Sequence, residues 1–142
     1  MPMATLYLSL GTNMGDRPKN LSQAMELIAR EVGTVVAASD VIETESWGFD
    51  SGNAFLNMVA KVETELEPID ALHVTQDIEK RLGRSEKSVN GVYHDRIIDI
   101  DLLMYDDLTM NTPQLTLPHP LMRQRPFVME PLSQIAPELT RS

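Results

Sequence analysis

The 142-residue chain contains no cysteine, which excludes disulfide bonds and a zinc site built from thiolates. No apolar run approaches the roughly 18 residues that a membrane span requires, and Met1–Thr5 lacks the basic region of a signal peptide. Basic residues are also scarce, because 12 Lys and Arg stand against 21 Asp and Glu, for a formal net charge of −9. Nucleic acids and anionic membranes both favour a basic surface, so neither is expected as the main partner. We therefore expect a cytoplasmic enzyme or binding domain.

The order of apolar patterns predicts the fold class. The predicted strands cover residues 5–10, 33–44, 55–64 and 97–104, and the predicted helices lie around residues 21–28, 68–83 and 127–135. The first six elements in the order βαββαβ indicate an α+β, ferredoxin-like core, a mainly antiparallel sheet with flanking helices. The length is that of one domain, so we expect a single domain over residues 1–142. Residues 84–95 are expected to form a polar loop, and residues 111–126 a proline-rich irregular segment.

The most informative residues are Asp99 and Asp101, which interrupt the apolar run from Ile97 to Met104. A strand has a period of two, so both carboxylates are expected on the same side of the sheet. Two ionised carboxylates side by side are costly unless a positive group neutralises them. Mg²⁺ suits this pair, because it takes one or two carboxylates together with waters and substrate phosphates. The alternative is a wet sheet face on which the aspartates pair with basic neighbours such as Arg96.

Most of the basic residues lie near this strand in the sequence. The seven between positions 80 and 125 are Lys80, Arg81, Arg84, Lys87, Arg96, Arg123 and Arg125. An acidic chain with this concentration of positive charge resembles a metal–phosphate site, although ordinary solvated helix charge accounts equally for Lys80 and Arg81. The segment 117–127 places His119 and two arginines between prolines, which restrict the backbone. Arginine is the preferred forked donor to phosphate. The alternative is a rigid surface loop that carries solubilising charge.

Three further features carry weaker signals. The loop Gly11–Gly15 opens a helix and is a possible anion site, but a tight turn needed for packing is the favoured interpretation. Trp47, with Phe55 and Asn57 further along, offers aromatic faces and one amide, which together suit a planar heterocycle. Core packing is the alternative for Phe55. Gln76 and Glu79 are expected to be solvated helix residues unless their helix borders a site.

Three motifs, in this order along the chain, resemble one known family. They are Leu10-Gly11-Thr12-Asn13-Met14-Gly15-Asp16, Arg96-x-x-Asp99-x-Asp101-Leu102-Leu103-x-Tyr105, and Pro118-His119-Pro120-x-x-x-x-Arg125-x-Phe127. The family is 6-hydroxymethyl-7,8-dihydropterin pyrophosphokinase, of the folate pathway. The resemblance implies transfer of the β,γ-diphosphate of ATP to the hydroxymethyl oxygen of the pterin, with release of AMP. It also implies two Mg²⁺ ions held by Asp99 and Asp101, small-molecule substrates as the partners, and a monomer, with a weak homodimer as the alternative.

The resemblance also assigns residues to each substrate. The residues matched to the ATP site are Gln76, Glu79, Arg84, Arg96, Ile100, His119, Arg123 and Arg125. Arg84 and Arg96 are matched to phosphate contacts and, with the two aspartates, form the expected catalytic set. The residues matched to the pterin pocket are Thr44, Ser46, Trp47, Phe55, Asn57, Asp99 and Phe127. Asn57 would bind the ring edge, with Phe55 and Phe127 on either side of the ring plane.

The chain departs from the family pattern just before the aspartate strand. Tyr93-His94-Asp95 stands where many relatives carry Trp-Gly-Pro, and Glu86 stands where they often carry a second arginine. The ATP contacts of the loop 84–95 are therefore the least transferable expectation. Two other hypotheses remain at this point: a different Mg²⁺-dependent nucleotide or phosphate enzyme on the same layout, and a non-catalytic ferredoxin-like binding module.

Overall fold

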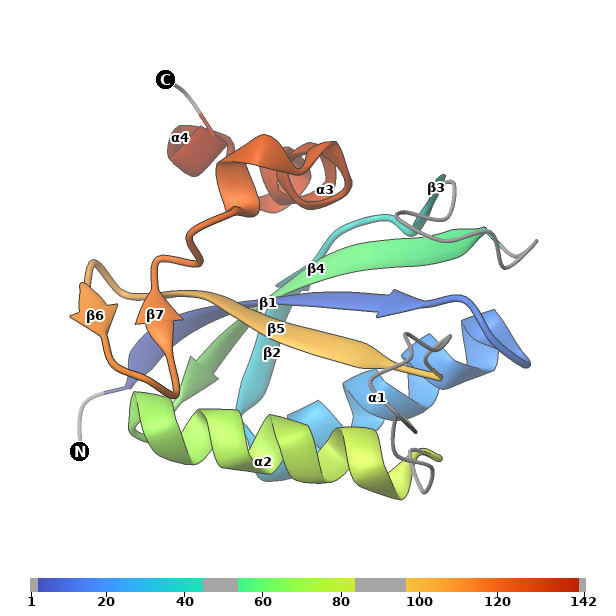
Figure 1. Ribbon diagram of the computed structural model, residues 1–142, viewed down its shortest axis with the longest axis horizontal. Coiled ribbons are helices and arrows are strands. Elements are labelled where there is room, and N and C mark those ends of the chain that lie inside the picture. The colour runs from blue at the N-terminus through green and yellow to red at the C-terminus, as the bar shows by residue number, and fades with distance from the viewer. Residues whose placement is uncertain (1–2, 45–53, 84–96, 141–142) are drawn as a thin grey trace.

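The computed structural model describes residues 3–44, 54–83 and 97–140, and within them five strands form one antiparallel sheet (Figure 1). The elements of this core are β1 (Ala4–Thr12), α1 (Arg17–Glu31), β2 (Thr34–Ala38), β3 (Ile42–Thr44), β4 (Phe55–Thr64), α2 (Pro68–Arg81) and β5 (Asp99–Tyr105). The sheet order is β2-β4-β1-β5, with β3 also paired to β4. This arrangement confirms the ferredoxin-like βαββαβ prediction.

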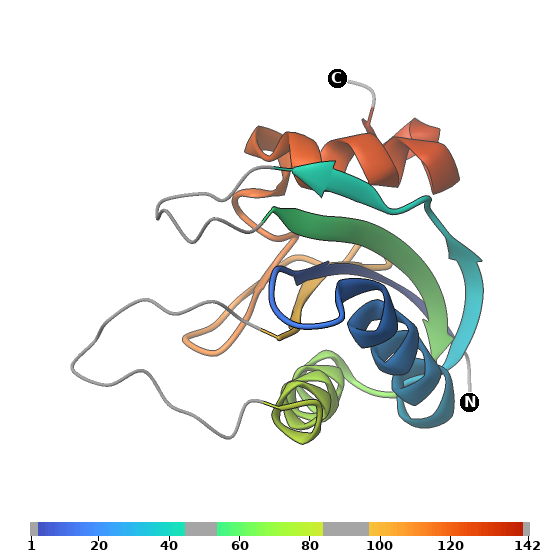
Figure 2. The same cartoon turned by 90° about the vertical axis from the view of Figure 1, so that its right-hand side faces the viewer.

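Helices cover both faces of the sheet. Helices α1 and α2 pack on one face, and α3 (Pro126–Ile135) packs on the other (Figure 2). The strands alternate accordingly: Leu6, Leu8 and Leu10 of β1 join the core beneath α1 and α2, whereas Tyr7 joins the smaller core beneath α3. Burial of one such leucine contributes about 1.5–3 kcal/mol. Ser9 and Gly11, which follow Tyr7 at every second position, therefore lie on the α3 face of the sheet.

The helix ends follow local chemistry. Asp16 caps α1 by accepting a 3.2 Å hydrogen bond from the backbone N–H of Lys19, and Pro18 occupies the first turn. Helix α2 stops at Arg81, two residues before Gly83, which has a φ of +126°. A Cβ atom on Gly83 would lie 2.5 Å from Ile97 Cδ1, so the end of that side chain would have to shift, and the positive φ itself favours glycine.

Several boundaries differ from the prediction. The expected strand 33–44 is divided into β2 and β3, and Ser39 marks the break: its hydroxyl accepts from the Val59 N–H and donates to the Asp40 carbonyl. Gly11 belongs to β1, where it pairs with Asp99, and not to a turn. The segment predicted to be irregular contains the hairpin β6 (Met110–Asn111) and β7 (Thr116–Leu117) and the short helix η1 (Met122–Gln124). The predicted loop 84–95 lies outside the described residues.

The C-terminal elements complete the α3 side of the sheet. Helix α3 continues through Pro131, and the short helix α4 (Pro137–Thr140) follows it. Val128 and Leu132 of α3 are fully enclosed against Val59 and Leu103 of the sheet. Among the described residues, no helix is both long enough and apolar enough to span a membrane.

Candidate active site

A pocket of about 380 Å³ lies on the α3 face of the sheet, where β1 ends and where β4 and β5 begin. Alternate residues of these strands form one side, and the junction between η1 and α3 forms the other. The lining residues are Ser9, Gly11, Thr44, Phe55, Asn57, Asp99, Asp101, Leu121, Gln124, Arg125, Pro126 and Phe127. Five of the predicted pterin residues, Asp99 among them, are therefore brought together, and Asp101 joins them.

Asp99 and Asp101 point into this pocket from the edge strand β5. Asp99 pairs with Gly11 and Asp101 with Ser9 across the ladder to β1, so small residues stand beside both carboxylates. Ile100, between them, is buried on the opposite face. The prediction that the two carboxylates share a side is confirmed. Oδ2 of Asp101 lies 4.0 Å from Nη1 of Arg125, and both side chains keep part of their surface exposed.

The two carboxylates of this pocket could bind a cation such as Mg²⁺ only if the substrate supplies further ligands. Two carboxylates supply the oxygen atoms that Mg²⁺ prefers. Among the described residues, no group of three or more acidic or histidine side chains is placed to hold a metal. Most of an octahedral shell would therefore come from water and from substrate oxygens, which is the usual situation for Mg²⁺ with phosphates. The residues present fit a shared Mg²⁺–phosphate site.

A compartment lined by aromatic and polar side chains lies beside the carboxylates. Asn57 is 4% exposed, and its amide nitrogen donates a 2.8 Å hydrogen bond to Oγ1 of Thr44, which fixes the direction of the amide. Gly11 leaves room for this amide, because a Cβ atom there would lie 3.0 Å from Oδ1 of Asn57. Phe55 and Phe127 supply aromatic surface from β4 and from the first turn of α3.

Arg125 joins the two compartments. It is the N-cap residue of α3, and its guanidinium carbon lies 5.6 Å from the centroid of the Phe127 ring, within the range of a cation–π contact. The same guanidinium faces Asp101. Asp101 therefore has a basic neighbour, Arg125, while the choice between a metal site and a paired wet face stays a prediction. Arg96, the basic neighbour expected from the sequence, lies outside the described residues.

His119 and Arg123 lie close to this junction in the chain but are not among the residues that line the pocket. His119 is half-buried, and its Nδ1 accepts a 3.1 Å hydrogen bond from the N–H of Leu121. Burial, and secondly the charge of Arg125, lower the pKa of His119 below its ordinary value, which favours the neutral ring. Arg123 is exposed, and its Nη1 donates a 3.1 Å hydrogen bond to the carbonyl of Leu139.

Glu79 has a structural contact that sequence reasoning missed. It is only 6% exposed, so the expectation of a solvated residue is wrong, whereas Gln76 is exposed as expected. Oε2 of Glu79 accepts a 2.7 Å hydrogen bond from the N–H of Ile100. Among the described strands, β5 lies at the edge of the sheet, so none of them pairs with this N–H on its outer side, and the acceptor comes from α2. Glu79 therefore holds the strand at the residue between the two aspartates.

The remaining predicted residues divide into two groups. Ser46, Trp47, Arg84 and Arg96 lie outside the described residues. The pocket residues that the sequence did not suggest are Ser9, Leu121, Gln124 and Pro126, and Gly11, expected in a turn, also lines the pocket. A signal for Ser9 and Gly11 exists in β1, where leucines alternate with smaller residues, and the smaller residues belong to the pocket face.

The family model for 7,8-dihydro-6-hydroxymethylpterin-pyrophosphokinase (HPPK) matches residues 7–137. The chain belongs to the HPPK family. It is 52% identical, over 138 residues, to the 2-amino-4-hydroxy-6-hydroxymethyldihydropteridine pyrophosphokinase of Porphyromonas gingivalis, with 96% of this chain and 94% of that protein covered. The equivalent enzyme of Aquifex aeolicus is 39% identical, with 96% and 83% covered, and that of Bacillus subtilis is 37% identical, with 95% and 80% covered.

Solved structures support the fold of this HPPK family member. The wild-type HPPK-DHPS of Plasmodium falciparum matches with a TM-score of 0.74 at 16% identity, covering 92% of this chain and 41% of that chain. A structure of HPPK-DHPS in complex with substrates also matches with a TM-score of 0.74, at 15% identity, covering 99% of this chain and 42% of that chain. At these identities the similarity concerns the fold, which agrees with the ferredoxin-like prediction.

Proposed function

We propose that this HPPK family member transfers diphosphate from ATP to the hydroxymethyl group of 6-hydroxymethyl-7,8-dihydropterin, with release of AMP, as a step in folate biosynthesis. The observation that carries the proposal is the shared pocket: two carboxylates, one oriented amide and two phenylalanines from separate elements line it together. Neither a phosphate site alone nor an aromatic pocket alone would need both compartments. The 52% identity to a relative named for this activity supports the same conclusion.

The pterin ring is proposed to lie between Phe55 and Phe127, with its edge at Asn57. Aromatic faces stack on a flat heterocycle, and an amide can both donate to and accept from the ring edge. Thr44 holds that amide in one orientation before the substrate arrives. A ring that lacks the matching edge would not satisfy the hydrogen-bonding capacity that Thr44 leaves available on Asn57, which costs free energy and gives selectivity. Ser46 and Trp47 are proposed as further pterin contacts.

The phosphates of ATP are proposed to lie beside Asp99 and Asp101, with two Mg²⁺ ions shared between these carboxylates and the substrates. Magnesium, when bound, would neutralise the phosphate oxygens and align the hydroxymethyl oxygen with the transferred group. Arg125 stands close enough to exchange its contact with Asp101 for one with a phosphate. The other proposed ATP contacts are Gln76, Glu79, Arg84, Arg96, Ile100, His119 and Arg123. Of these, Arg84 and Arg96 are proposed to bind the reacting phosphates.

The proposal extends to the molecular context. We propose that residues 1–142 act as one domain, as a monomer with small molecules as its partners, and in the cytoplasm. The packing of the described helices around one five-stranded sheet supports the one-domain proposal. The formal net charge of −9 supports small substrates over a nucleic acid.

Substitution of the aspartates tests the proposed site. Asp99→Asn and Asp101→Asn keep the size of each side chain but remove a negative metal ligand, and each is expected to lower Mg²⁺-dependent AMP formation by at least about a hundredfold, as for loss of one transition-state contact. Asp107→Asn is the matched control, because Asp107 is an exposed carboxylate beyond the end of the same strand and is not among the pocket residues. Normal turnover in either folded pocket variant would refute the metal assignment.

A further inference from the structure

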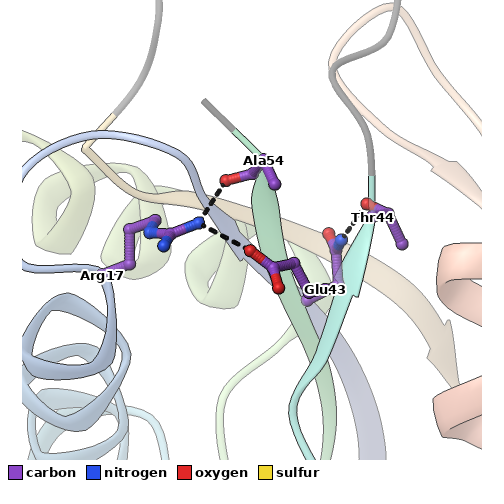
Figure 3. Close-up of polar contacts among 5 residues, drawn as sticks. Arg17, Glu43, Thr44 and Ala54 are labelled. Carbon is purple, nitrogen blue, oxygen red and sulfur yellow. Dashed lines mark hydrogen bonds and ion pairs between the residues drawn. The ribbon is translucent and has the colours of Figure 1, made fainter. Parts of the chain in front are cut away.

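Arg17, at the start of α1, links two segments that carry pterin-pocket residues, although it does not line the pocket itself. Its Nη1 donates a 2.7 Å hydrogen bond to the carbonyl oxygen of Ala54 and lies 3.3 Å from Oε2 of Glu43 (Figure 3). Ala54 immediately precedes Phe55, and Glu43 immediately precedes Thr44. The Arg17 guanidinium therefore contacts both Ala54 and Glu43, each of which directly precedes a residue that lines the pocket.

The contacts lie behind the pocket. Glu43 and Thr44 are consecutive residues of β3, so their side chains leave opposite faces of the strand. Thr44 faces the pocket and accepts the hydrogen bond from Asn57, whereas Glu43 extends toward Arg17 and α1 (Figure 3). Arg17 therefore supports the compartment from the outer side without touching its contents.

The strand that Arg17 supports is weak by itself. Strand β3 has three residues, and its ladder with β4 consists of the pairs Ile42 with Asn57, Glu43 with Leu56, and Thr44 with Phe55. A ladder this short at a sheet margin has little cooperative stability. The pair of Thr44 with Phe55 ends the ladder, and the Arg17 contacts act beside that pair.

Of the two contacts, the hydrogen bond to Ala54 is expected to matter more. The carbonyl bond is short, partly buried and charge-assisted. The Glu43 side chain is 60% exposed, and exposed ion pairs contribute little. Arg17 also occupies the first residue of α1, where a positive charge is unfavourable for the helix dipole. The contacts of Arg17 with Ala54 and Glu43, both outside the helix, offset this unfavourable position.

We propose that Arg17 is a positioning residue for pterin specificity: it fixes the ends of β3 and β4 so that Thr44, Phe55 and Asn57 hold the geometry that binds the pterin ring. This inference rests on the proposed function. It predicts a selective effect, because the carboxylates Asp99 and Asp101 belong to β5, on the other side of β1 from β3 and β4. Loss of Arg17 should weaken pterin binding and leave nucleotide binding nearly unchanged.

Calorimetric titration of the full chain tests the proposal with two ligands. A non-hydrolysable ATP analogue with Mg²⁺ is titrated first, and 6-hydroxymethylpterin is then titrated into the saturated protein. For Arg17→Ala we expect the pterin dissociation constant to rise about tenfold, equivalent to about 1.4 kcal/mol, and the nucleotide constant to change less than about twofold. Lys19→Ala is the matched control, since it removes an exposed basic side chain from the same helical turn and should change neither constant.

Two further variants separate a positioning role from a general structural one. Glu43→Gln should have a smaller effect than Arg17→Ala, because it keeps the bond to Ala54. Arg17→Lys keeps the charge but lacks the fork, and it should give an intermediate pterin constant even if Arg17→Ala fails to fold. Amide hydrogen exchange should be faster in β3 of the Arg17 variants, while the β1–β5 ladder keeps the protection of the wild type.

The outcomes distinguish this inference from the proposed function. If the wild-type protein binds the pterin but Arg17→Ala and Arg17→Lys bind it equally well, the positioning role is wrong and the proposed function stands. Equal weakening of both ligands in the folded variants would also overturn the positioning role. If the wild-type protein itself does not bind the pterin, the proposed function fails, and this inference fails with it.

Discussion

At the scale of single residues, Arg125 connects the parts of the site. Its guanidinium lies over Phe127, faces Asp101 and contributes to the lowered pKa of His119. A positive group beside a carboxylate reduces the cost of holding Asp101 ionised before any substrate binds. An incoming phosphate offers Arg125 a stronger, forked partner. Under the proposed function, Arg125 would exchange its contact with Asp101 for one with a phosphate.

The pKa of His119 gives a pH prediction. Its folded-state pKa lies below the ordinary value of 6.5, so between these two values the unfolded chain binds more protons than the folded chain. Folding stability from this group is therefore fully present above pH 6.5 and is lost as pH falls toward the folded-state pKa. The hydrogen bond from the Leu121 N–H to Nδ1 of His119 also favours the neutral ring, because a protonated Nδ1 cannot accept it. Loss of this bond at low pH therefore adds to the loss of stability.

His119→Asn tests this dependence, because an asparagine oxygen can accept from the Leu121 N–H without titrating in this range. We expect urea unfolding to show a smaller loss of free energy between pH 7.5 and pH 5.5 in the variant than in the wild type. Nuclear magnetic resonance titration of the ring should give a pKa below 6.5 for the wild type. Equal pH dependence of the two proteins would contradict the assignment.

The sequence predicts residue spacing better than residue contacts. The shared side of Asp99 and Asp101 follows from strand periodicity alone, as does the burial of Ile100. The sequence does not predict that Arg123 and Arg125 point in different directions. The two arginines lie in one short segment, and the turn of η1 sets the direction of each side chain. One donates to Leu139 and the other faces the pocket.

At the scale of elements, the link between α2 and β5 shows why an acidic helix residue becomes buried. The pattern of α2 places Ile78 in the core, and Glu79 is adjacent to it in the sequence. Sequence periodicity alone favours solvent for an acidic residue in that position. The edge of β5 overrides this preference, since the N–H of Ile100 must find an acceptor. The break between β2 and β3 has a similar origin, because the Ser39 hydroxyl bonds to the Val59 backbone at the point where the predicted strand is interrupted.

Removal of the Glu79 acceptor is expected to destabilise the protein. Glu79→Leu leaves the buried N–H of Ile100 unpaired, which costs about 1–3 kcal/mol, whereas Glu79→Gln keeps an acceptor oxygen and should cost less. Gln76→Leu, at an exposed position of the same helix, is the control and should change the free energy of unfolding by less than about 0.5 kcal/mol. Urea unfolding without ligands measures all three. Equal stability of Glu79→Leu and Gln76→Leu would contradict the proposed contact.

At the scale of the whole molecule, the pocket exists because α3 crosses the sheet face opposite α1 and α2 (Figure 2). The strands supply the carboxylates and the amide, and the η1–α3 junction supplies Arg125 and Phe127. The element order predicts the sheet, because short connections and antiparallel pairing leave few alternatives. It does not predict where the proline-rich segment returns to the sheet, since that position depends on packing between Val128, Leu132 and the strands far away in sequence.

The most direct test of the account identifies the products. Wild-type protein is mixed with ATP, Mg²⁺ and 6-hydroxymethyl-7,8-dihydropterin, and the phosphorus resonances are followed by nuclear magnetic resonance. We expect AMP and a pterin diphosphate to form in equal amounts, because one intact diphosphate group moves in a single transfer. Formation of ADP with a pterin monophosphate, or ATP hydrolysis that does not depend on the pterin, would contradict it.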